Sequence, residues 1–323
     1  MEIVPYVRRA DWPRHDVLLD HLRARLTELA ADADDGPIRF VEMADLDPAD
    51  RDAVRVAIVD GPAPEQLDAL PNLEWVQSTW AGVEAILAVV PEHVEIARMV
   101  DPQLAHTMAE AVMTWTLYLH RDMPTYAQQQ SARRWIEQPL VRTSDRRIGV
   151  LGLGALGTVA AARLASIGFD VAGWARTPKA VDGVETFAGE TGFDLLLERS
   201  DIVVNLLPDT PETRGLLGTD AFGRLPDGAS IINFGRGPTV DDAALLDALE
   251  DGRIDHAVLD VFVTEPLPDD HPYWDHPRVT VLPHISGPTS PDTAAVIALD
   301  NVQRWITHGE LPDDALVDRS RGY

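Results

Sequence analysis

The sequence predicts an α/β protein of two domains, each built on a parallel sheet that is covered by helices. Strand-like and helix-like segments alternate along most of the chain, which is the pattern of parallel strands joined by crossing helices. A length of 323 residues is sufficient for two domains. A helical pattern at residues 290–308 follows the last predicted strand without starting a new domain, so we expect the chain to return and complete the first domain.

The first hundred residues carry the elements of the smaller domain. Strand signals at residues 2–7, 54–60 and 73–78 alternate with a helical pattern at residues 16–30. Residues 79–83, Thr-Trp-Ala-Gly-Val, read as a loop directly after the third strand. This order predicts a parallel sheet, with strands joined by helices, at the start of the chain.

The middle of the chain carries the larger domain. A long apolar helix with little polar face is predicted at residues 107–120, and another helix at residues 241–250. Strands are predicted at residues 147–151, 170–174, 202–206, 230–233, 256–260 and 279–282. We therefore expect a six-stranded doubly wound domain at residues 102–288, and a smaller domain formed by residues 1–101 and 289–323.

Composition excludes several kinds of protein and site. There is no cysteine, so disulfides, thiolate catalysis and cysteine-rich zinc sites are excluded. The ten histidines show no HExxH or HxH pairing, so no metal site is expected. No stretch approaches the roughly 18 apolar residues of a membrane helix. The N-terminal segment has charges and proline where a signal peptide has an apolar core, so we expect a cytoplasmic location and no membrane partner.

The chain is strongly acidic. Its formal net charge is −26, aspartate supplies 36 of the 53 acidic residues, and Lys179 is the only lysine. Such a surface repels nucleic acid, so no nucleic-acid partner is expected. The excess acid is typical of a salt-rich cytosol, where screening shortens charge repulsion, and also of a GC-rich genome, which favours Arg and Asp codons. Both interpretations stay open.

A glycine-rich turn indicates where a dinucleotide binds. Gly152-Leu-Gly154-Ala155-Leu156-Gly157 follows the strand at residues 147–151 and opens a helix. In this Rossmann-type fingerprint the first glycine permits the tight turn, the second lets the pyrophosphate approach the backbone, and the third allows close helix packing. The N–H groups at the start of the helix then bind phosphate.

The end of the next strand indicates which dinucleotide is used. An acidic residue about 20 positions after the glycines would bind the ribose 2′-hydroxyl of NAD. Ala175 stands there instead, followed by Arg176 and Thr177, with Lys179 close by. A guanidinium and a hydroxyl suit a 2′-phosphate. We therefore expect NADP(H) to be preferred, with NAD(H) use possible.

Three polar residues follow strands in the last third of the chain. Arg236 is flanked by glycines that expose its side chain, and a guanidinium can hold a carboxylate with two hydrogen bonds. Glu265 and His284 also lie past strand ends, where ligands bind in open α/β sheets. A carboxylate beside an imidazole raises the pKa of that imidazole, which can then protonate a carbonyl oxygen at neutral pH. The set predicts transfer of a hydride and a proton to a carboxylate-bearing substrate.

In combination these motifs resemble the D-isomer-specific 2-hydroxyacid dehydrogenases. The resemblance covers most of the chain, including LEWVQSTWAGV, GLGALG, LLPDTPETRGLL, INFGRGPTVDDAALLDAL, LDVFVTEPLP and HPRVTVLPHIS. The WARTPK loop, Trp135 and the ending VDRSRGY at residues 317–323 are most similar to the glyoxylate/hydroxypyruvate reductase A branch. The resemblance implies a Rossmann nucleotide domain, a flavodoxin-like substrate domain built from both chain ends, and a homodimer joined through the nucleotide domains.

The resemblance also implies a role for each site residue. Arg236 would bind the substrate carboxylate and carbonyl, and His284, oriented by Glu265, would donate the proton. The substrate would also contact Trp80 and the backbone amides of Ala81, Gly82 and Val83. Asp260 would contact the nicotinamide amide. The cofactor would further contact Leu206, Leu207, Pro208, Thr213, Phe234, Gly235, Ser286 and Gly287. Many relatives carry Ala or Ser at position 235 rather than Gly.

The implied reaction is reduction of a 2-oxo acid, such as glyoxylate or hydroxypyruvate, by NADPH. The resembled branch carries a tryptophan at position 60, whereas this chain has Asp60; if Asp60 faces the pocket, it would disfavour a second anionic group on the substrate. The alternatives are an NAD-dependent D-2-hydroxyacid dehydrogenase for a longer or different substrate, and a non-catalytic NAD(P)H-responsive binding protein. A formate-type enzyme would need no proton donor, so the Glu265–His284 combination argues against it.

Overall fold

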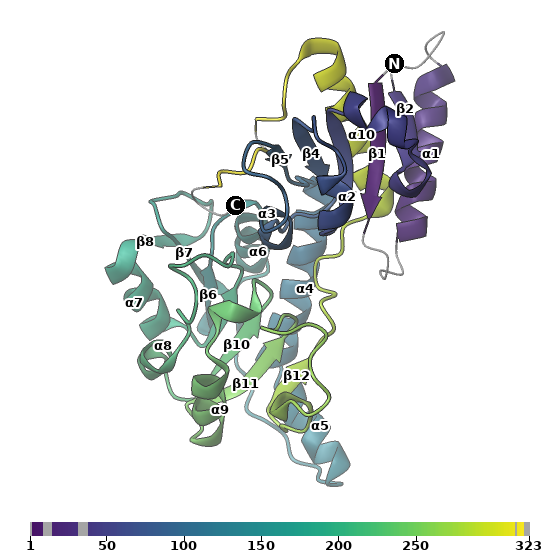
Figure 1. Ribbon diagram of the computed structural model, residues 1–323. Helices are drawn as coiled ribbons and strands as arrows, with labels where there is room; N and C mark the ends of the chain where they lie inside the picture. Colours follow the sequence, from purple (N-terminus) through teal and green to yellow (C-terminus); the bar gives the residue numbers. More distant parts are fainter. Residues whose placement is uncertain (1, 9–14, 32–37, 314, 320–323) are drawn as a thin grey trace. The chain divides into compact units, whose positions relative to one another are not determined.

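The computed structural model describes residues 2–8, 15–31, 38–313 and 315–319 (Figure 1). The chain divides into two compact units, one of Met1–Gln103 with Thr289–Tyr323 and one of Leu104–Pro288. Residues 320–323, part of the ending used for the resemblance, lie outside the described residues. Two parallel-sheet α/β units confirm the predicted fold class.

The first unit contains a five-stranded parallel sheet in the order β2-β1-β3-β4-β5, the arrangement found in flavodoxin. Its strands are β1 (Glu2–Arg8), β2 (Ile38–Glu42), β3 (Val56–Asp60), β4 (Trp75–Ser78) and β5 (Glu95–Ala97). Strands β2 and β5 were not predicted from the sequence. Strand β2 is only partly buried and β5 is three residues long, so neither shows a clear apolar run.

Helix α10 (Pro291–His308) returns from the end of the second unit to the first. In Figure 1 it lies beside α1 (His15–Ala31), and the rings of Trp305 and Trp75 pack edge to face with centroids 5.9 Å apart. The Asn301 amide also donates to the Gln77 side chain on β4 at 2.9 Å. The remaining helical segments of this unit are η1 (Met43–Asp45), η2 (Pro48–Ala53), α2 (Pro64–Asp68) and α3 (Glu84–Leu87).

The second unit contains a seven-stranded parallel sheet in the order β12-β11-β10-β9-β6-β7-β8. Its strands are β6 (Arg147–Leu151), β7 (Asp170–Ala175), β8 (Glu185–Ala188), β9 (Ile202–Asn205), β10 (Ala229–Asn233), β11 (Ile254–Leu259) and β12 (Val279–Val281). The expected six-strand count was therefore wrong, because β8 is a short, partly exposed edge strand without an apolar run. The reversal of strand order lies between β6 and β9, where ligands bind in doubly wound sheets.

Buried central strands explain why most strands of this sheet could be predicted from the sequence. Strands β9 and β10 are buried at every position, as expected for strands covered by helices on both faces. The helical segments of the unit are α4 (Pro102–His120, whose first two residues fall in the first unit), α5 (Met123–Ser131), η3 (Thr143–Asp145), α6 (Ala155–Ser166), α7 (Gly189–Arg199), α8 (Thr219–Arg224), η4 (Gly237–Thr239), α9 (Asp242–Glu250) and η5 (Pro272–Trp274). Within the described ranges, no helix is both long enough and apolar enough to span a membrane.

Candidate active site

The glycine turn has the backbone that a bound dinucleotide requires. Gly152 follows β6 with φ +97°, a conformation that side-chain-bearing residues rarely adopt. A Cβ on Gly157 would lie 1.9 Å from the Gly152 carbonyl oxygen, so only glycine fits there. No atom lies within 4 Å of a Cβ built on Gly154, and no side chain caps the helix α6 that begins after it. This open, uncapped helix start suits a pyrophosphate.

The end of β7 carries the residues expected near a 2′-phosphate. Ala175 closes the strand and is buried, whereas Arg176, Thr177 and Lys179 are exposed. Glu212, which the sequence analysis did not single out, is also part of this surface. Hydrogen bonds from its own main-chain N–H and from the Thr210 side chain hold its pKa below the usual value, and the Arg176 charge adds a smaller effect.

The loop after β9 is closed by its own side chains. Leu207 is buried, while Leu206 and Pro208 are half-buried. The Thr213 hydroxyl donates to the Pro208 carbonyl at 2.6 Å and accepts from the Thr210 N–H at 2.8 Å. Thr213 therefore holds the shape of the turn that carries Leu206–Leu207–Pro208.

Arg236 lies on a tightly packed loop after β10. Phe234 and Gly235 are buried, and Arg236 is half-buried, with Nη1 donating to the Gly235 carbonyl at 2.8 Å. A Cβ on Gly237 would lie 2.0 Å from the carbonyl carbon of Phe262, which shows how closely the two backbones approach. The glycines predicted to expose the arginine thus also let its loop pack against the segment that leads to Glu265.

His284 and Glu265 form a hydrogen-bonded pair. Nδ1 of His284 lies 2.7 Å from Oε2 of Glu265, and Oε1 of Glu265 accepts from the Phe262 N–H at 2.9 Å. Because a carboxylate only accepts, the proton sits on Nδ1 and leaves Nε2 for a substrate. His284 has φ 52°, so the backbone turns sharply there, three residues after β12 ends at Val281.

The pKa values of the pair move in opposite directions. The hydrogen bond to Glu265 raises the pKa of His284 above its usual value, against partial burial and the Arg236 charge. Partial burial acts to raise the pKa of Glu265, but the hydrogen bonds from His284 and Phe262 outweigh it, and the pKa of Glu265 is lowered. Both shifts favour an imidazolium beside a carboxylate near neutral pH.

Asp260 holds the loop that carries the histidine. Its buried carboxylate accepts from the N–H of Ile285 at 2.7 Å and from the N–H of Ser286 at 2.9 Å. The Ser286 hydroxyl is itself buried and has no hydrogen-bond partner among the described residues. A buried hydroxyl without a hydrogen-bond partner destabilises the fold unless a ligand provides that partner, so this position fits a cofactor amide. Gly287 lies next to it, where a Cβ would meet the terminal methyl of Met108 at 2.6 Å.

The expected substrate loop lies in the first unit, after β4. Every polar group of Trp80 is engaged there: its N–H donates to the Ser78 hydroxyl at 2.9 Å, its carbonyl accepts from Met99 at 2.9 Å, and its indole N–H donates to Asp60 at 2.8 Å. Ala81 and Gly82 are half-buried and Val83 is buried. Among the described residues, no acceptor is in hydrogen-bond contact with the N–H of Ala81 or Gly82.

Asp60 is buried; from the sequence alone it was open whether this residue faces the substrate pocket. It ends β3, its side chain is almost fully enclosed, and it accepts from the hydroxyls of Tyr6 at 2.7 Å and Thr79 at 2.8 Å as well as from Trp80. Burial, with the adjacent Asp60 carboxylate, raises the pKa of Tyr6 well above its usual range. Within its unit, Asp60 therefore organises the start of the 79–83 loop.

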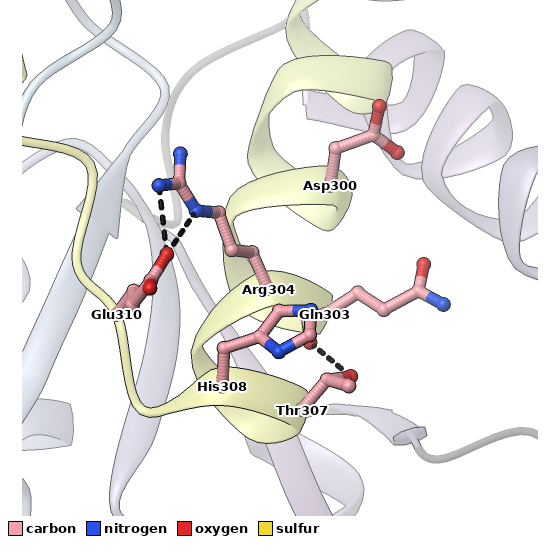
Figure 2. A pocket seen from close by; sticks show the side chains of 6 residues that line it. All are labelled: Asp300, Gln303, Arg304, Thr307, His308 and Glu310. Carbon is pink, nitrogen blue, oxygen red and sulfur yellow. Dashed lines mark hydrogen bonds and ion pairs between the residues drawn. The ribbon is translucent and has the colours of Figure 1, made fainter.

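A second surface feature contains none of the expected site residues. A hollow of about 540 Å³ along α10 is lined by Asp300, Gln303, Arg304, Thr307, His308 and Glu310, whose side chains are drawn in Figure 2. Arg304 and Glu310 form an ion pair with one another at 2.8 Å. No three His, Asp or Glu side chains within the described ranges are arranged to hold a metal ion.

Three buried polar residues beside the site escaped the sequence analysis: Asn205, Asn233 and Thr239. Asn205 ends the otherwise apolar strand IVVN, and Asn233 ends ASIIN, which is apolar apart from Ser230. A polar residue at the carboxyl end of a buried parallel strand was the available signal, because that edge is where ligands bind.

Comparisons with known proteins agree with this arrangement. Residues 113–286 match the family model described as the D-isomer specific 2-hydroxyacid dehydrogenase NAD-binding domain. Glyoxylate/hydroxypyruvate reductase A of Yersinia enterocolitica is 39% identical over 295 residues, which cover 88% of this chain and 91% of that protein. The same-named protein of Photorhabdus laumondii is 39% identical over 274 residues, covering 83% of this chain and 87% of its own length.

Two solved structures are similar over essentially the whole chain. A D-isomer specific 2-hydroxyacid dehydrogenase from Xanthobacter autotrophicus, solved with NADPH, has 39% identity and a TM-score of 0.86, covering 100% of this chain and 99% of that one. A glyoxylate/hydroxypyruvate reductase from Sinorhizobium meliloti, solved with NADP and sulfate, has 31% identity and a TM-score of 0.86, covering 100% of both chains. The chain belongs to the D-isomer specific 2-hydroxyacid dehydrogenase family and is an oxidoreductase of that family.

Proposed function

We propose that this protein reduces a small 2-oxo acid to the D-2-hydroxy acid with NADPH, glyoxylate and hydroxypyruvate being the first candidates. The observation that carries the proposal is the His284–Glu265 hydrogen bond of 2.7 Å in the same unit as the glycine turn and Arg236. A histidine kept protonated by a carboxylate is a proton donor suited to a carbonyl oxygen at neutral pH. The names of the relatives support the choice of acids.

Arg236 is the proposed anchor for the substrate carboxylate and carbonyl. Its fork of N–H groups matches a carboxylate, and its positive charge offsets the local repulsion from a strongly acidic chain. The N–H groups of Ala81, Gly82 and Val83, which follow Trp80, are proposed as further substrate-binding groups. His284 would then deliver the proton through Nε2, while Glu265 stabilises the imidazolium that precedes transfer.

The residues present fit a nicotinamide dinucleotide. When bound, the cofactor supplies the hydride. The open start of α6 after Gly154 would hold the pyrophosphate, and the orphaned Ser286 hydroxyl and Asp260 would hold the nicotinamide end. Arg176, Thr177 and Lys179 are exposed beside the buried Ala175, so a 2′-phosphate meets positive charge and no carboxylate at the strand end. This pattern favours NADPH over NADH.

A homodimer is also proposed. Between α5 and η3, the side chains of Trp135, Leu140 and Ile136 are 96%, 81% and 55% exposed. Clustered apolar side chains this exposed are typical of an interaction surface rather than of a monomer in water. Since this segment belongs to the nucleotide unit, we propose that a second copy of the chain covers it. Light scattering of the wild type and of Trp135→Ser tests this: the wild type should be dimeric, and a monomeric wild type contradicts it.

A steady-state panel tests the proposed reaction. Loss of NADPH absorbance is measured with glyoxylate, hydroxypyruvate and longer 2-oxo acids, with NADPH and NADH in parallel. We expect turnover with at least one short acid and a higher kcat/KM with NADPH. Tight binding of NADPH without turnover on any acid of the panel would overturn the reductase assignment and favour a cofactor-responsive binding protein instead.

A further inference from the structure

Three fully buried neutral side chains join the ends of β9 and β10 beneath the candidate site. Asn205, Asn233 and Thr239 are each at most 1% exposed. Nδ2 of Asn205 donates to Oδ1 of Asn233 at 2.9 Å and to Oγ1 of Thr239 at 2.7 Å. Both of its protons are therefore used, and turning the amide over would place oxygen against oxygen at two contacts. We call these three residues the Asn–Thr network.

The Asn–Thr network holds the backbone of two functional loops at once. On the cofactor side, Oδ1 of Asn205 accepts from the Leu207 N–H at 3.2 Å. On the arginine side, Oδ1 of Asn233 accepts from the Gly235 N–H at 3.2 Å. The Arg236 carbonyl accepts from the Thr239 hydroxyl at 2.6 Å, from Nδ2 of Asn233 at 3.2 Å and from the Thr239 N–H at 3.2 Å, so two of its three bonds come from side chains of the network.

Gly235 provides an independent sign that the two loops are locked together. A Cβ at this position would lie 2.6 Å from the Leu207 carbonyl oxygen and 2.8 Å from the Leu207 nitrogen. These are main-chain atoms, so neither can turn aside as a flexible side chain could. The arginine loop and the cofactor-facing loop thus approach backbone to backbone, and the Asn–Thr network is hydrogen-bonded to both.

We infer that Asn205, Asn233 and Thr239 are positioning residues that set Arg236 relative to the cofactor-facing loop. The inference rests on the proposed function of Arg236 and of Leu206–Leu207–Pro208. None of the three touches the reacting atoms; they act through the main chain of Arg236 and Leu207. Buried hydrogen bonds of fixed geometry suit this task, because a misplacement of about 1 Å at a binding group can cost about 100-fold in rate.

The three side chains carry no charge, and this separates their role from that of Glu265. Removing a neutral hydrogen bond changes the position of Arg236 without removing the carboxylate that raises the pKa of His284. Variants of the Asn–Thr network should therefore lower kcat/KM and leave its pH profile in place. Variants of Glu265 should instead shift the pH profile of kcat/KM to lower pH.

Thr239→Val is the main test, because it keeps the side-chain shape and removes the hydroxyl. We expect kcat/KM for the 2-oxo acid to fall about 10- to 100-fold, while the NADPH dissociation constant and the pH profile stay as in the wild type. Thr239→Ser, which keeps the hydroxyl, should retain most of the wild-type kcat/KM. Asn233→Ala removes the bond to the Arg236 carbonyl and both bonds that Oδ1 accepts without adding a charge, and should show the same kinetic defect.

Ser200→Ala is the matched control for general destabilisation. Ser200 is fully buried in the same unit, and its hydroxyl donates to the Leu196 carbonyl at 2.6 Å, outside both loops. It should lower Tm without changing kcat/KM. If Thr239→Val folds and keeps wild-type kcat/KM, or if Ser200→Ala loses as much kcat/KM as Thr239→Val for a similar fall in Tm, the inference is wrong.

A binding measurement keeps the test independent of turnover. Oxamate, a carboxylate probe shaped like a 2-oxo acid, should raise the Tm of the NADPH-loaded wild type and of Thr239→Ser, but not of Thr239→Val. An equal shift in all three proteins contradicts the inference even if no acid is reduced. A wild type without turnover contradicts the proposed function instead, so the two failures are distinguishable.

Discussion

Nδ1 of His284 and Oε2 of Glu265 lie 2.7 Å apart, although 18 residues separate them in the sequence. The two residues follow neighbouring parallel strands, Glu265 after β11 and His284 after β12, so both reach the same edge of the sheet. The contact joins the two residues that the proposed reaction requires for proton transfer.

Replacing His284 with Gln should remove the proton donor and leave the cofactor site intact. We expect kcat to fall about 100- to 10,000-fold, the usual contribution of general acid catalysis. The NADPH dissociation constant, measured by fluorescence titration, should stay near the wild-type value. His308→Gln is the control, because His308 is exposed on α10 and should leave both quantities unchanged. A fully active His284→Gln would show that the proton comes from another group.

The pH dependence of reduction should follow the raised pKa of His284. The protonated imidazole is the active form, so kcat/KM should be maximal at lower pH and fall as pH rises through a pKa above the usual 6.5. Glu265→Gln removes the largest cause of the shift, so the fall should begin at a lower pH. An unchanged pH profile in Glu265→Gln would contradict the assignment of the pair.

Stability should depend on pH through the same pair. The His284 contribution is fully present below its usual pKa of 6.5 and is lost as pH rises through the raised folded value. The Glu265 contribution is present above its usual pKa of 4.5 and is lost as pH falls through the lowered folded value. The difference in Tm between the wild type and Glu265→Gln should therefore be largest between these limits. A constant difference from acid to alkaline pH would argue against the pair.

Arg176 and Glu212 should act in opposite senses on cofactor choice. Arg176→Ala should raise the KM for NADPH about 10-fold or more, the usual effect of losing a charged hydrogen bond, and leave the KM for NADH nearly unchanged. Glu212→Gln removes a negative charge near that guanidinium and should lower the KM for NADPH, most clearly at low salt. Equal effects of Arg176→Ala on both cofactors would refute a 2′-phosphate contact.

Trp80→Phe and Tyr6→Phe form a matched pair on the buried Asp60 carboxylate. Each removes one hydrogen bond to the carboxylate and should lower the free energy of unfolding by about 1.5–3 kcal/mol. Because Trp80 directly precedes Ala81, only Trp80→Phe should also raise the KM for the 2-oxo acid. Denaturant unfolding and steady-state kinetics measure the two effects. Similar KM values for the 2-oxo acid in both variants would show that Trp80 does not contribute to substrate binding.

Salt should distinguish the two explanations of the acidic composition. If the −26 net charge is an adaptation to a salt-rich cytosol, Tm should rise steeply with KCl as repulsion is screened. The KM for the anionic substrate should fall over the same range. If codon usage alone explains the composition, Tm should change little beyond low ionic strength.

Most of the fold could be predicted from the sequence because the patterns that indicate its strands and its glycine turn are local. Strands such as β9 and β10 are buried at every position and mostly apolar, and the glycine turn is a contiguous motif at a strand end. The misses were β2, β5 and β8, where strands are short or partly exposed and neighbouring strands, rather than their own apolar pattern, define them.

Local chemistry in the sequence was therefore sufficient to indicate two parallel sheets, a dinucleotide turn and the residue types of a hydride and proton transfer site. Tertiary structure alone decided which groups meet: that Asp60 is enclosed by Tyr6, Thr79 and Trp80, and that Asn205, Asn233 and Thr239 join two loops. The physical reason is that a buried polar side chain must find its partners across strands. Those partners lie up to 54 residues away along the chain, so no local pattern can reveal them.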